Sequence, residues 1–448
     1  MSWLIAILVI ALVYVIYTLV PELIFHTLHI GSFYHGRSTE RQLALTFDDG
    51  PDARYTPQIL DILKEKRIQA TFFIVGERAE AHPDLVRRMV EEGHHVGIHS
   101  YQHRHAFFLA PRQTFRQIAE AKAAVSRLTG LPVRYYRPPW GAFNWVTWFT
   151  CRSLGLTPVL WSVRAKDWLA GNQAEGIVTR VLRAAQPGSI VLCHDAGGAP
   201  GAPMNTIAAL PHVLQQLERL NFGFTTVSQL HEDWLTHSKS AGKQVYRTYP
   251  FFRRLLISIW QLVEFGFARV YHVLTLNAIF RISPSEWTHG ERRDPDTGEI
   301  LLEDGAKAID LHFQNDTLLA VSGAHDNRAL IKALRMTRYG FQDIARVMNY
   351  HPSYKDAEVV AAFTLMNRGI ELLGFHVEEL PDTWGKRWLQ MYMRFLMGMY
   401  HPDGFRRLHE GRQELTLKLV WMTRKEVLDL YGTREDLQRT MPVSETTR

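Results

Sequence analysis

The chain has 448 residues, more than one hydrophobic core usually supports, so two domains are expected. With 46% hydrophobic and 21% charged residues, its composition is that of a folded protein and excludes extended disorder. Lys and Arg outnumber Asp and Glu by 51 to 45 without forming a basic block, which argues against a nucleic-acid-binding protein, and two cysteines are too few for a disulfide framework.

The first expected element is an apolar segment at residues 3–20, WLIAILVIALVYVIYTLV, which contains no charge. About 18 such residues can cross a bilayer core roughly 30 Å thick. The segment lacks the basic start and small-residue cleavage site of a signal peptide. We therefore expect an uncleaved transmembrane anchor at residues 1–24, making a single-pass membrane protein. The alternative, a buried core helix, is disfavoured because the run has no amphipathic face.

After a connector at residues 25–40, strand and helix patterns alternate up to residue 233. The expected strands are 42–47, 70–75, 95–98, 158–163, 189–192 and 223–227, and the main expected helices are 56–66, 83–92 and 112–128. This alternation predicts parallel strands joined by crossover helices, an α/β layered or barrel fold. In such folds the chemistry collects at the carboxyl ends of the strands.

The alternation stops at the polar stretch 236–243, which is expected to be a linker. Together with an apolar run at 251–274, expected to be a buried or membrane-surface helix, it lies in a linking region at 234–283. An α+β domain is predicted at 284–435, before a tail at 436–448. Its expected strands are 300–303, 308–313 and 414–422, and its expected helices are 327–338, 357–373, 384–399 and 423–430.

Two polar motifs lie directly after expected strands of the first domain. Asp48 and Asp49 stand at a strand-to-turn break, where both carboxylates can face one cleft. His99 and His103 are four residues apart, a spacing that brings two imidazoles together on one helical turn. Two His and a carboxylate form a common ligand set for a hydrolytic divalent metal. Each motif alone is weak, because surface histidines and ordinary turn chemistry explain them equally well.

Three further motifs come later in the chain, and the five together carry a resemblance. They are Arg137-Pro138-Pro139-Trp140-Gly141, Asp167-Trp168 and Leu192-Cys193-His194. In type, order and spacing the set resembles the polysaccharide deacetylase family (NodB-like, carbohydrate esterase family 4), over residues 41–233. The resemblance implies an irregular (β/α) barrel of the NodB type and a hydrolase that removes acetyl groups from N-acetylated sugars.

The resemblance also implies a metal site and a base. Asp49, His99 and His103 would hold one divalent metal ion, zinc in the first place, with cobalt, manganese or nickel as alternatives. Asp48 would be the general base that takes a proton from the metal-activated water, and Arg137 would tether it.

The remaining motif residues would supply the acid and the substrate pocket. His194 would protonate the leaving amine, and Asp167 would orient it and keep it charged. Trp168 and Leu192 would line the pocket for the acetyl methyl group, and the backbone N–H near Trp140 would help to hold the oxyanion.

Arg164 departs from the family pattern. Many members carry a further acid at this position, three residues before the Asp-Trp pair, and its loss could change substrate choice if that acid positions the active-site arginine. Cys193 is expected to pack within a strand rather than act as a nucleophile. The glycine-rich stretch at 196–203 is expected to form a loop over the cleft.

Residues 284–432 resemble the YkoP-type domain, through segments such as EILLEDGAKAIDLHFQN and MNRGIELLGF. The domain offers no recognisable catalytic set, and His312, His351 and His376 are expected to be structural. We expect it to bind substrate or a partner.

These expectations combine into a membrane-anchored enzyme that deacetylates amino sugars of peptidoglycan or a chitin-like polymer, with a glycan and the membrane as partners and no nucleic acid. Such polymers place the body outside the cytoplasm, although the flanking Arg37 and Arg41 lean weakly towards a cytoplasmic body. If the body faced the cytoplasm, a lipid-linked sugar would be the better substrate. The alternatives are another amide hydrolase or a catalytically silent glycan-binding scaffold. The complete motif set favours an enzyme over the scaffold. The sequence gives no oligomeric state.

Overall fold

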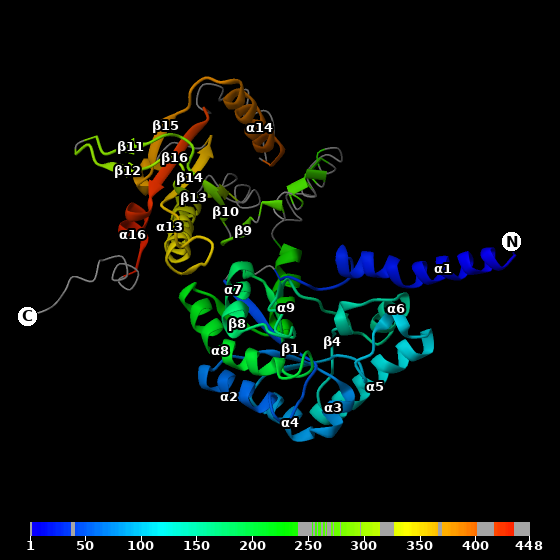
Figure 1. Ribbon diagram of the computed structural model, residues 1–448. Coiled ribbons are helices and arrows are strands. Elements are labelled where there is room, and N and C mark those ends of the chain that lie inside the picture. The colour runs from blue at the N-terminus through cyan, green and yellow to red at the C-terminus, as the bar shows by residue number, and fades with distance from the viewer. Residues whose placement is uncertain are drawn as a thin grey trace, which may run out of the picture. The chain divides into compact units, whose positions relative to one another are not determined.

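The computed structural model describes residues 2–36, 41–240, 253–313 apart from scattered positions, 327–365, 370–400 and 416–433. The chain divides into two compact units (Figure 1). The first comprises residues 1–218 and 222–236, and the second comprises 219–221 and 237–448.

The first unit is an irregular (β/α) barrel, as expected. Its sheet has the strand order β5-β4-β3-β2-β1-β7-β6, with β8 paired to the start of β1, and every pair is parallel. The strands are β1 (Gln42–Asp48), β2 (Thr71–Ile74), β3 (His95–Ile98), β4 (Tyr135–Tyr136), β5 (Thr157–Pro158), β6 (Val163–Arg164), β7 (Ile190–His194) and β8 (Gly223–Thr225).

Helices cover the outside of this sheet (Figure 1). They are α2 (Thr56–Lys66), α3 (Gly76–Ala81), α4 (Pro83–Glu91), α5 (Pro111–Thr129), α6 (Trp145–Ser153), α7 (Ala174–Ala184), α8 (Ala202–Arg219) and α9 (Val227–Ser240). Because parallel strands are covered on both faces, they are buried along most of their length. Six of the seven residues of β1 are buried accordingly.

A short segment near the N-terminus closes the barrel where the sheet is open. Phe33 N–H donates to Pro158 O at 2.8 Å, and Gly36 N–H donates to Gly188 O at 2.8 Å. Phe33 and His35 thereby form bridges to Val159 and Ser189, on opposite sides of the gap. This segment satisfies backbone groups that an open sheet edge would leave exposed.

Two local predictions in the first unit were wrong, and one helix was missed. The single strand expected at 158–163 is two short strands, β5 and β6, because the intervening backbone turns to Phe33: Leu160 N–H donates to Phe33 O at 2.8 Å. Helix α6 (WVTWFTCRS) was not predicted, since its aromatic and β-branched residues favour strands. The expected linker at 236–243 begins inside α9, which continues to Ser240.

The apolar segment at the N-terminus is helix α1 (Ser2–Pro21), which continues as the π-helix η1 (Glu22–Thr27). Residues Ile5–Thr27 are long and apolar enough to cross a membrane, and only 11% of the most apolar window is buried. The far end of this helix packs on the barrel: Phe25 is buried with Phe143 and Leu160.

The second unit has an α+β fold around a mixed sheet of order β15-β16-β14-β13-β10-β9, with a separate hairpin of β11 and β12. The strands are β9 (Leu274–Thr275), β10 (Phe280–Glu286), β11 (Arg292–Arg293), β12 (Ile300–Leu302), β13 (Lys307–Phe313), β14 (Val359–Thr364), β15 (His376–Glu379) and β16 (Lys418–Thr423). Its longer helices are α13 (Asn327–Tyr350), α14 (Trp384–Tyr400) and α16 (Arg424–Tyr431).

The helix predicted at 357–373 was wrong, because its first half is strand β14. The strand lies between β13 and β16 and is almost wholly buried, so both faces are apolar and no alternation marks it. Residues 370–373 form a 3₁₀ turn, η4 (Ile370–Leu373). Half of the positions of the helix expected at 251–274 lie outside the described residues, and those described between 253 and 270 are helical. The tail at 436–448 also lies outside the described residues.

Candidate active site

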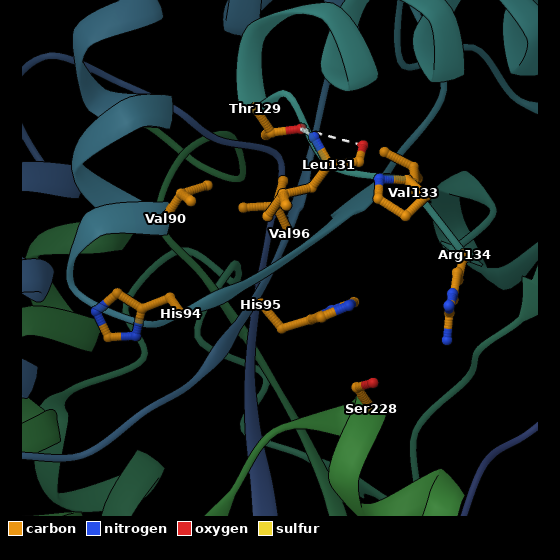
Figure 2. A pocket seen from close by; sticks show the side chains of 10 residues that line it. Val90, His94, His95, Val96, Thr129, Leu131, Val133, Arg134 and Ser228 are labelled. Atoms are coloured by element: carbon orange, nitrogen blue, oxygen red, sulfur yellow. Dashed lines mark hydrogen bonds between the residues drawn. The ribbon is translucent and has the colours of Figure 1, made fainter.

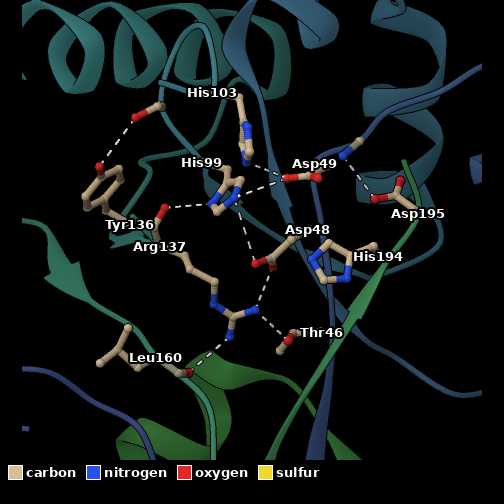
Figure 3. Close-up of polar contacts among 12 residues, drawn as sticks. Thr46, Asp48, Asp49, His99, His103, Tyr136, Arg137, Leu160, His194 and Asp195 are labelled. Atoms are coloured by element: carbon tan, nitrogen blue, oxygen red, sulfur yellow. Dashed lines mark hydrogen bonds and ion pairs between the residues drawn. The ribbon is translucent and has the colours of Figure 1, made fainter. Parts of the chain in front are cut away.

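Three potential metal ligands lie together at the carboxyl ends of β1 and β3 (Figure 3). One ligand atom each from Asp49, His99 and His103 lies within 4.8 Å of the others. Asp49 Oδ1 is 3.3 Å from His99 Nε2 and 2.9 Å from His103 Nε2.

Backbone turns, not a helix, bring these residues together. The expectation that His99 and His103 share a helical turn was wrong: both lie in the loop after β3. Ser100 and His103 have φ angles of 67° and 39°, and Asp49 has a φ of 74° just after β1. Such left-handed conformations are disfavoured for these residue types and cluster at functional sites.

The donor set fits a divalent cation. His99 Nδ1 donates to Arg137 O at 2.7 Å, which orients the ring with Nε2 towards Asp49. Asp49 Oδ1 is buried and receives no well-aligned hydrogen bond. Burial would raise the pKa of Asp49, but the two imidazoles lower it well below its usual range, so the carboxylate is ionised. Acceptor atoms that converge in a buried site are stabilised by a cation.

Asp48 has different surroundings from its neighbour. Arg137 Nη1 donates to Asp48 Oδ1 at 2.6 Å and also to Thr46 Oγ1 at 2.7 Å, while Nη2 donates to Leu160 O at 3.2 Å (Figure 3). Burial lowers the pKa of Arg137, and Asp48 opposes that effect, so the fully buried guanidinium keeps its charge. The second oxygen, Asp48 Oδ2, lies 4.0 Å from His99 Nε2, on the side of the metal ligands.

His194 stands beside Asp48, because the two residues are register partners on β1 and β7. Its Nδ1 donates to Asp167 Oδ1 at 2.9 Å, and its backbone N–H donates to Asp167 Oδ2 at 2.7 Å. Thr206 Oγ1 also donates to Asp167 Oδ2, at 2.8 Å. Burial disfavours the charged ring, but the carboxylate outweighs it and raises the pKa of His194 to about 9. The imidazole is therefore an acid at neutral pH.

Aromatic and apolar side chains surround these polar groups. The Trp168 ring lies 5.1 Å from the His194 ring, and the Trp140 ring lies 4.4 Å from the His103 ring. Trp140 is 55% exposed and has a φ of 58°. Leu192 is buried on β7. Burial raises the pKa of the neighbouring Cys193 thiol well above its usual range, which makes it a poor nucleophile.

The structure adds Asp195, which the sequence reasoning missed. It is fully buried and accepts hydrogen bonds from Gly50 N–H at 3.1 Å and from Thr56 Oγ1 at 2.6 Å. It thereby ties the end of β7 to the turn after Asp49. Burial raises the pKa of this carboxyl to about 7. The sequence signal that could have identified Asp195 was its position directly after His194, at the end of a strand.

Arg164 takes no part in this network. It is exposed, and its guanidinium lies 5.4 Å from the centre of the Trp161 ring, which is also 5.7 Å from the Arg137 guanidinium. Arg137 Nε has no hydrogen-bond partner among the described residues. Among the described residues, no acid therefore contacts Arg137 Nε in place of the acid that the family pattern has at position 164.

A surface pocket elsewhere in the barrel carries no comparable chemistry (Figure 2). It lies at the amino ends of β3 and β4 and includes His94, His95 and Arg134. Burial lowers the pKa of both histidines to about 4, so they are neutral. Among the described residues, the only group that could hold a metal is Asp49, His99 and His103. His312, His351 and His376 of the second unit are not part of such a group.

Comparison with known proteins gives two family matches and several relatives. Residues 35–159 match the polysaccharide deacetylase family, and residues 253–431 match the YkoP domain. A peptidoglycan-N-acetylglucosamine deacetylase of Bacillus cereus is 37% identical over 195 residues, which are 43% of this chain and 89% of the relative. A chitooligosaccharide deacetylase of a Bradyrhizobium species is 36% identical over 209 residues, 44% of this chain and 94% of the relative.

A solved structure is also similar to part of this chain. The crystal structure of the Bc1960 peptidoglycan N-acetylglucosamine deacetylase has 32% sequence identity and a TM-score of 0.43. The match covers 46% of this chain and 95% of that one.

Proposed function

Because this chain belongs to the polysaccharide deacetylase family, we propose that it is a membrane-anchored, metal-dependent enzyme that removes N-acetyl groups from amino sugars of an envelope glycan. The relatives named above act on peptidoglycan N-acetylglucosamine or on chitooligosaccharides, which supports an N-acetylglucosamine-containing substrate.

Asp49, His99 and His103 would hold the metal ion, with zinc as the first candidate. When bound, a divalent ion polarises the acetamide carbonyl and lowers the pKa of water from about 16 towards 7. His99 is oriented for this role by its bond to Arg137 O, and burial excludes competing water from Asp49.

Asp48 would accept a proton from the water that attacks the carbonyl carbon. Its pairing with Arg137 balances the charge of the buried carboxylate and fixes one oxygen, so the other oxygen is the proton acceptor. The backbone N–H near Trp140 would help to hold the carbonyl oxygen as its negative charge develops.

His194 would donate its proton to the amide nitrogen as the C–N bond breaks. Acetate and a free amino sugar are then released. Asp167 keeps the imidazole charged at neutral pH and holds its orientation through two hydrogen bonds. Leu192 and Trp168 would form the apolar pocket for the acetyl methyl group.

The N-terminal helix α1 would anchor this body in the membrane. We place the catalytic body outside the cytoplasm, because peptidoglycan and chitin-like polymers lie there. The YkoP unit would bind substrate or a partner.

The observation that carries the proposal is the meeting of three metal-binding atoms with an aspartate–arginine pair and a charged histidine at one end of the barrel. The test is acetate release by the full-length protein from chito-oligosaccharides and from peptidoglycan, after chelation and addition of Zn, Co or Mn. Metal-dependent release that disappears in Asp48→Asn is expected. A metal-loaded protein that releases no acetate from either substrate would favour the silent scaffold.

A further inference from the structure

The barrel surface beside α1 carries exposed aromatic side chains that have no part in the catalytic site. Phe108 and Phe149 expose 79% and 59% of their surface. The Phe149 ring lies 6.3 Å from that of Trp145 and 5.3 Å from that of Trp148. We call Phe108, Trp145, Trp148 and Phe149 the aromatic face. Trp145, Trp148 and Phe149 form one cluster of rings, and exposed apolar clusters of this kind mark interaction sites.

The aromatic face is attached directly to the apolar helix. Trp145 Nε1 donates to Ile16 O at 2.8 Å, and Trp148 stacks on Phe25 of η1 at 5.4 Å. On the Phe108 side, Tyr17 OH donates to Leu109 O at 3.2 Å. The face therefore surrounds the point at which α1 meets the barrel.

The position of these contacts along α1 sets their depth in a membrane. The apolar span is Ile5–Thr27, yet the contacts with the barrel begin at Ile16. From Ile5 to Ile16 a helix rises by only about 17 Å, whereas the hydrocarbon core is about 30 Å thick. If this span crosses the core, the aromatic face reaches the boundary between acyl chains and headgroups.

The charge around the face suits an anionic surface. From Gly93 to Lys166 the only acidic residue is Glu120, against ten Lys and Arg residues. This stretch of the sequence includes all four residues of the aromatic face. Arg104, Arg112 and Arg152 are exposed, and the Arg152 guanidinium lies 4.9 Å from the centre of the Trp148 ring. Aromatic residues with flanking arginines are typical of interfacial surfaces.

A continuous line of rings leads from this face to the metal ligands. The His103 ring lies 4.4 Å from that of Trp140, which lies 5.1 Å from that of His105. His105 in turn lies 5.5 Å from Phe108. The cleft therefore opens close to the aromatic face.

We propose that the aromatic face docks on an anionic lipid bilayer and holds the catalytic cleft at the level of the headgroups. The acetamido sugars that the enzyme deacetylates are accordingly those held at the membrane surface, such as sugars carried on a lipid. This inference rests on the proposed function and on the anchoring of α1.

Spin labelling of the full-length protein in nanodiscs of phosphatidylcholine and phosphatidylglycerol tests the docking. A nitroxide on Phe149→Cys should collide with oxygen and be shielded from an aqueous nickel chelate. The matched label on Glu65→Cys, exposed on α2, should show the reverse. The wild type gives the labelling background, because Cys151 and Cys193 are buried. Equal nickel access at both sites, in protein that co-elutes with nanodiscs, would refute docking while leaving the anchor intact. Failure to co-elute would remove the anchor and the inference together.

Kinetics with two substrates tests the consequence for the reaction. In the double variant Phe108→Asp/Phe149→Asp, turnover of an N-acetylglucosaminyl lipid in phosphatidylglycerol-containing vesicles should fall about tenfold through KM, because two apolar side chains leave the bilayer. Its kcat/KM on a soluble chito-oligosaccharide should stay unchanged. The paired variant Phe108→Leu/Phe149→Leu should retain both activities.

A second control introduces an aspartate at an exposed apolar position outside the aromatic face. Leu131 is also exposed but lies with the pocket at the amino ends of β3 and β4, so Leu131→Asp should leave both activities intact. Equal losses on both substrates in the double aspartate variant, or no loss on either, would overturn the inference. Absence of acetate release by the wild type from both substrates would refute the proposed function, a result that the spin-label measurement does not depend on.

Discussion

Asp48 and Asp49 are chain neighbours whose carboxylates face one cleft in different environments. Asp48 ends β1 and pairs with Arg137, whereas the left-handed backbone at Asp49 turns its carboxylate to His99 and His103. Two acids so close in sequence serve different purposes only if their charges are neutralised by different partners. Here one partner is a guanidinium, and the other would be the metal ion.

Replacement of His103 by Ala should remove metal and activity together. The remaining two ligands hold a divalent ion weakly, so we expect metal affinity and acetate release to fall on the order of a hundredfold or more. Metal content of the dialysed protein, measured by mass spectrometry, gives the first quantity. His105→Ala, at the neighbouring imidazole outside the ligand group, should keep its metal. The assignment fails if His103→Ala binds metal as the wild type does.

Replacement of Asp167 by Asn should shift the pH dependence of kcat. His194 has a raised pKa of about 9, so its acidic form is present below that pH and is lost as the pH rises through 9. Without the carboxylate, burial dominates and lowers this pKa, which moves the alkaline limb to lower pH. At pH 7 we expect kcat to fall on the order of a hundredfold.

Acetate release between pH 6 and pH 10 measures this shift. Thr206→Ser keeps the hydroxyl that donates to Asp167 and should show the wild-type limb. An unchanged limb in Asp167→Asn would mean that another group is the general acid.

At the scale of elements, the site is built where parallel strands end and their loops begin. Asp48 and His194 are aligned because β1 and β7 are register neighbours, and the loop after β7 returns over the cleft. That loop approaches Asp49 so closely that only glycine fits: a Cβ on Gly197 would lie 2.2 Å from Asp49 Oδ2. The glycine-rich stretch thus closes on a candidate metal ligand.

Replacement of Gly197 by Ala should displace the Asp49 carboxylate. We expect activity and metal affinity to fall at least about tenfold, because a shift of a ligand by an ångström disrupts the site. Gly201→Ala is the matched control, since Gly201 also has a positive φ but a Cβ there would meet no atom within 4 Å. Both variants should lose about 1 kcal/mol of stability from backbone strain, measured by thermal unfolding. Equal catalytic losses in the two would attribute the effect to strain alone.

At the scale of the whole molecule, the chain combines a catalytic barrel, a YkoP unit and an apolar helix that projects from the barrel. The helix is exposed along most of its length, which is unfavourable in water and favourable in a bilayer. The barrel contacts of its second half fix the catalytic body relative to that helix.

A charge in the middle of α1 should weaken membrane association. Ile10 is exposed, and Ile10→Arg should cost about 2.5–3.5 kcal/mol of insertion free energy. We therefore expect a larger share of this variant in the supernatant after alkaline extraction of membranes, with unchanged activity on a soluble chito-oligosaccharide. Ile10→Leu should stay in the pellet. Complete retention of Ile10→Arg would argue against a membrane span.

Sequence alone was sufficient for the class of fold and the family. Local patterns carry this information: alternating strands and helices dictate a parallel sheet, and such a sheet aligns the ends of β1, β3 and β7 at one edge. Asp48, His99 and His194 could therefore be grouped without coordinates, and the structure places them at that edge.

Only the tertiary structure decided which backbone turns bring these side chains together and which strands lie in the middle of a sheet. The left-handed turns at Asp49 and His103, the strand β14 in place of a helix, and Asp195 beneath Gly50 each depend on partners far away in the chain. Periodicity reports which side of a segment is buried, but a segment buried on all sides has none. The aromatic face depends likewise on where α1 docks, because Trp145 and Leu109, the neighbour of Phe108, contact that helix only in the folded barrel.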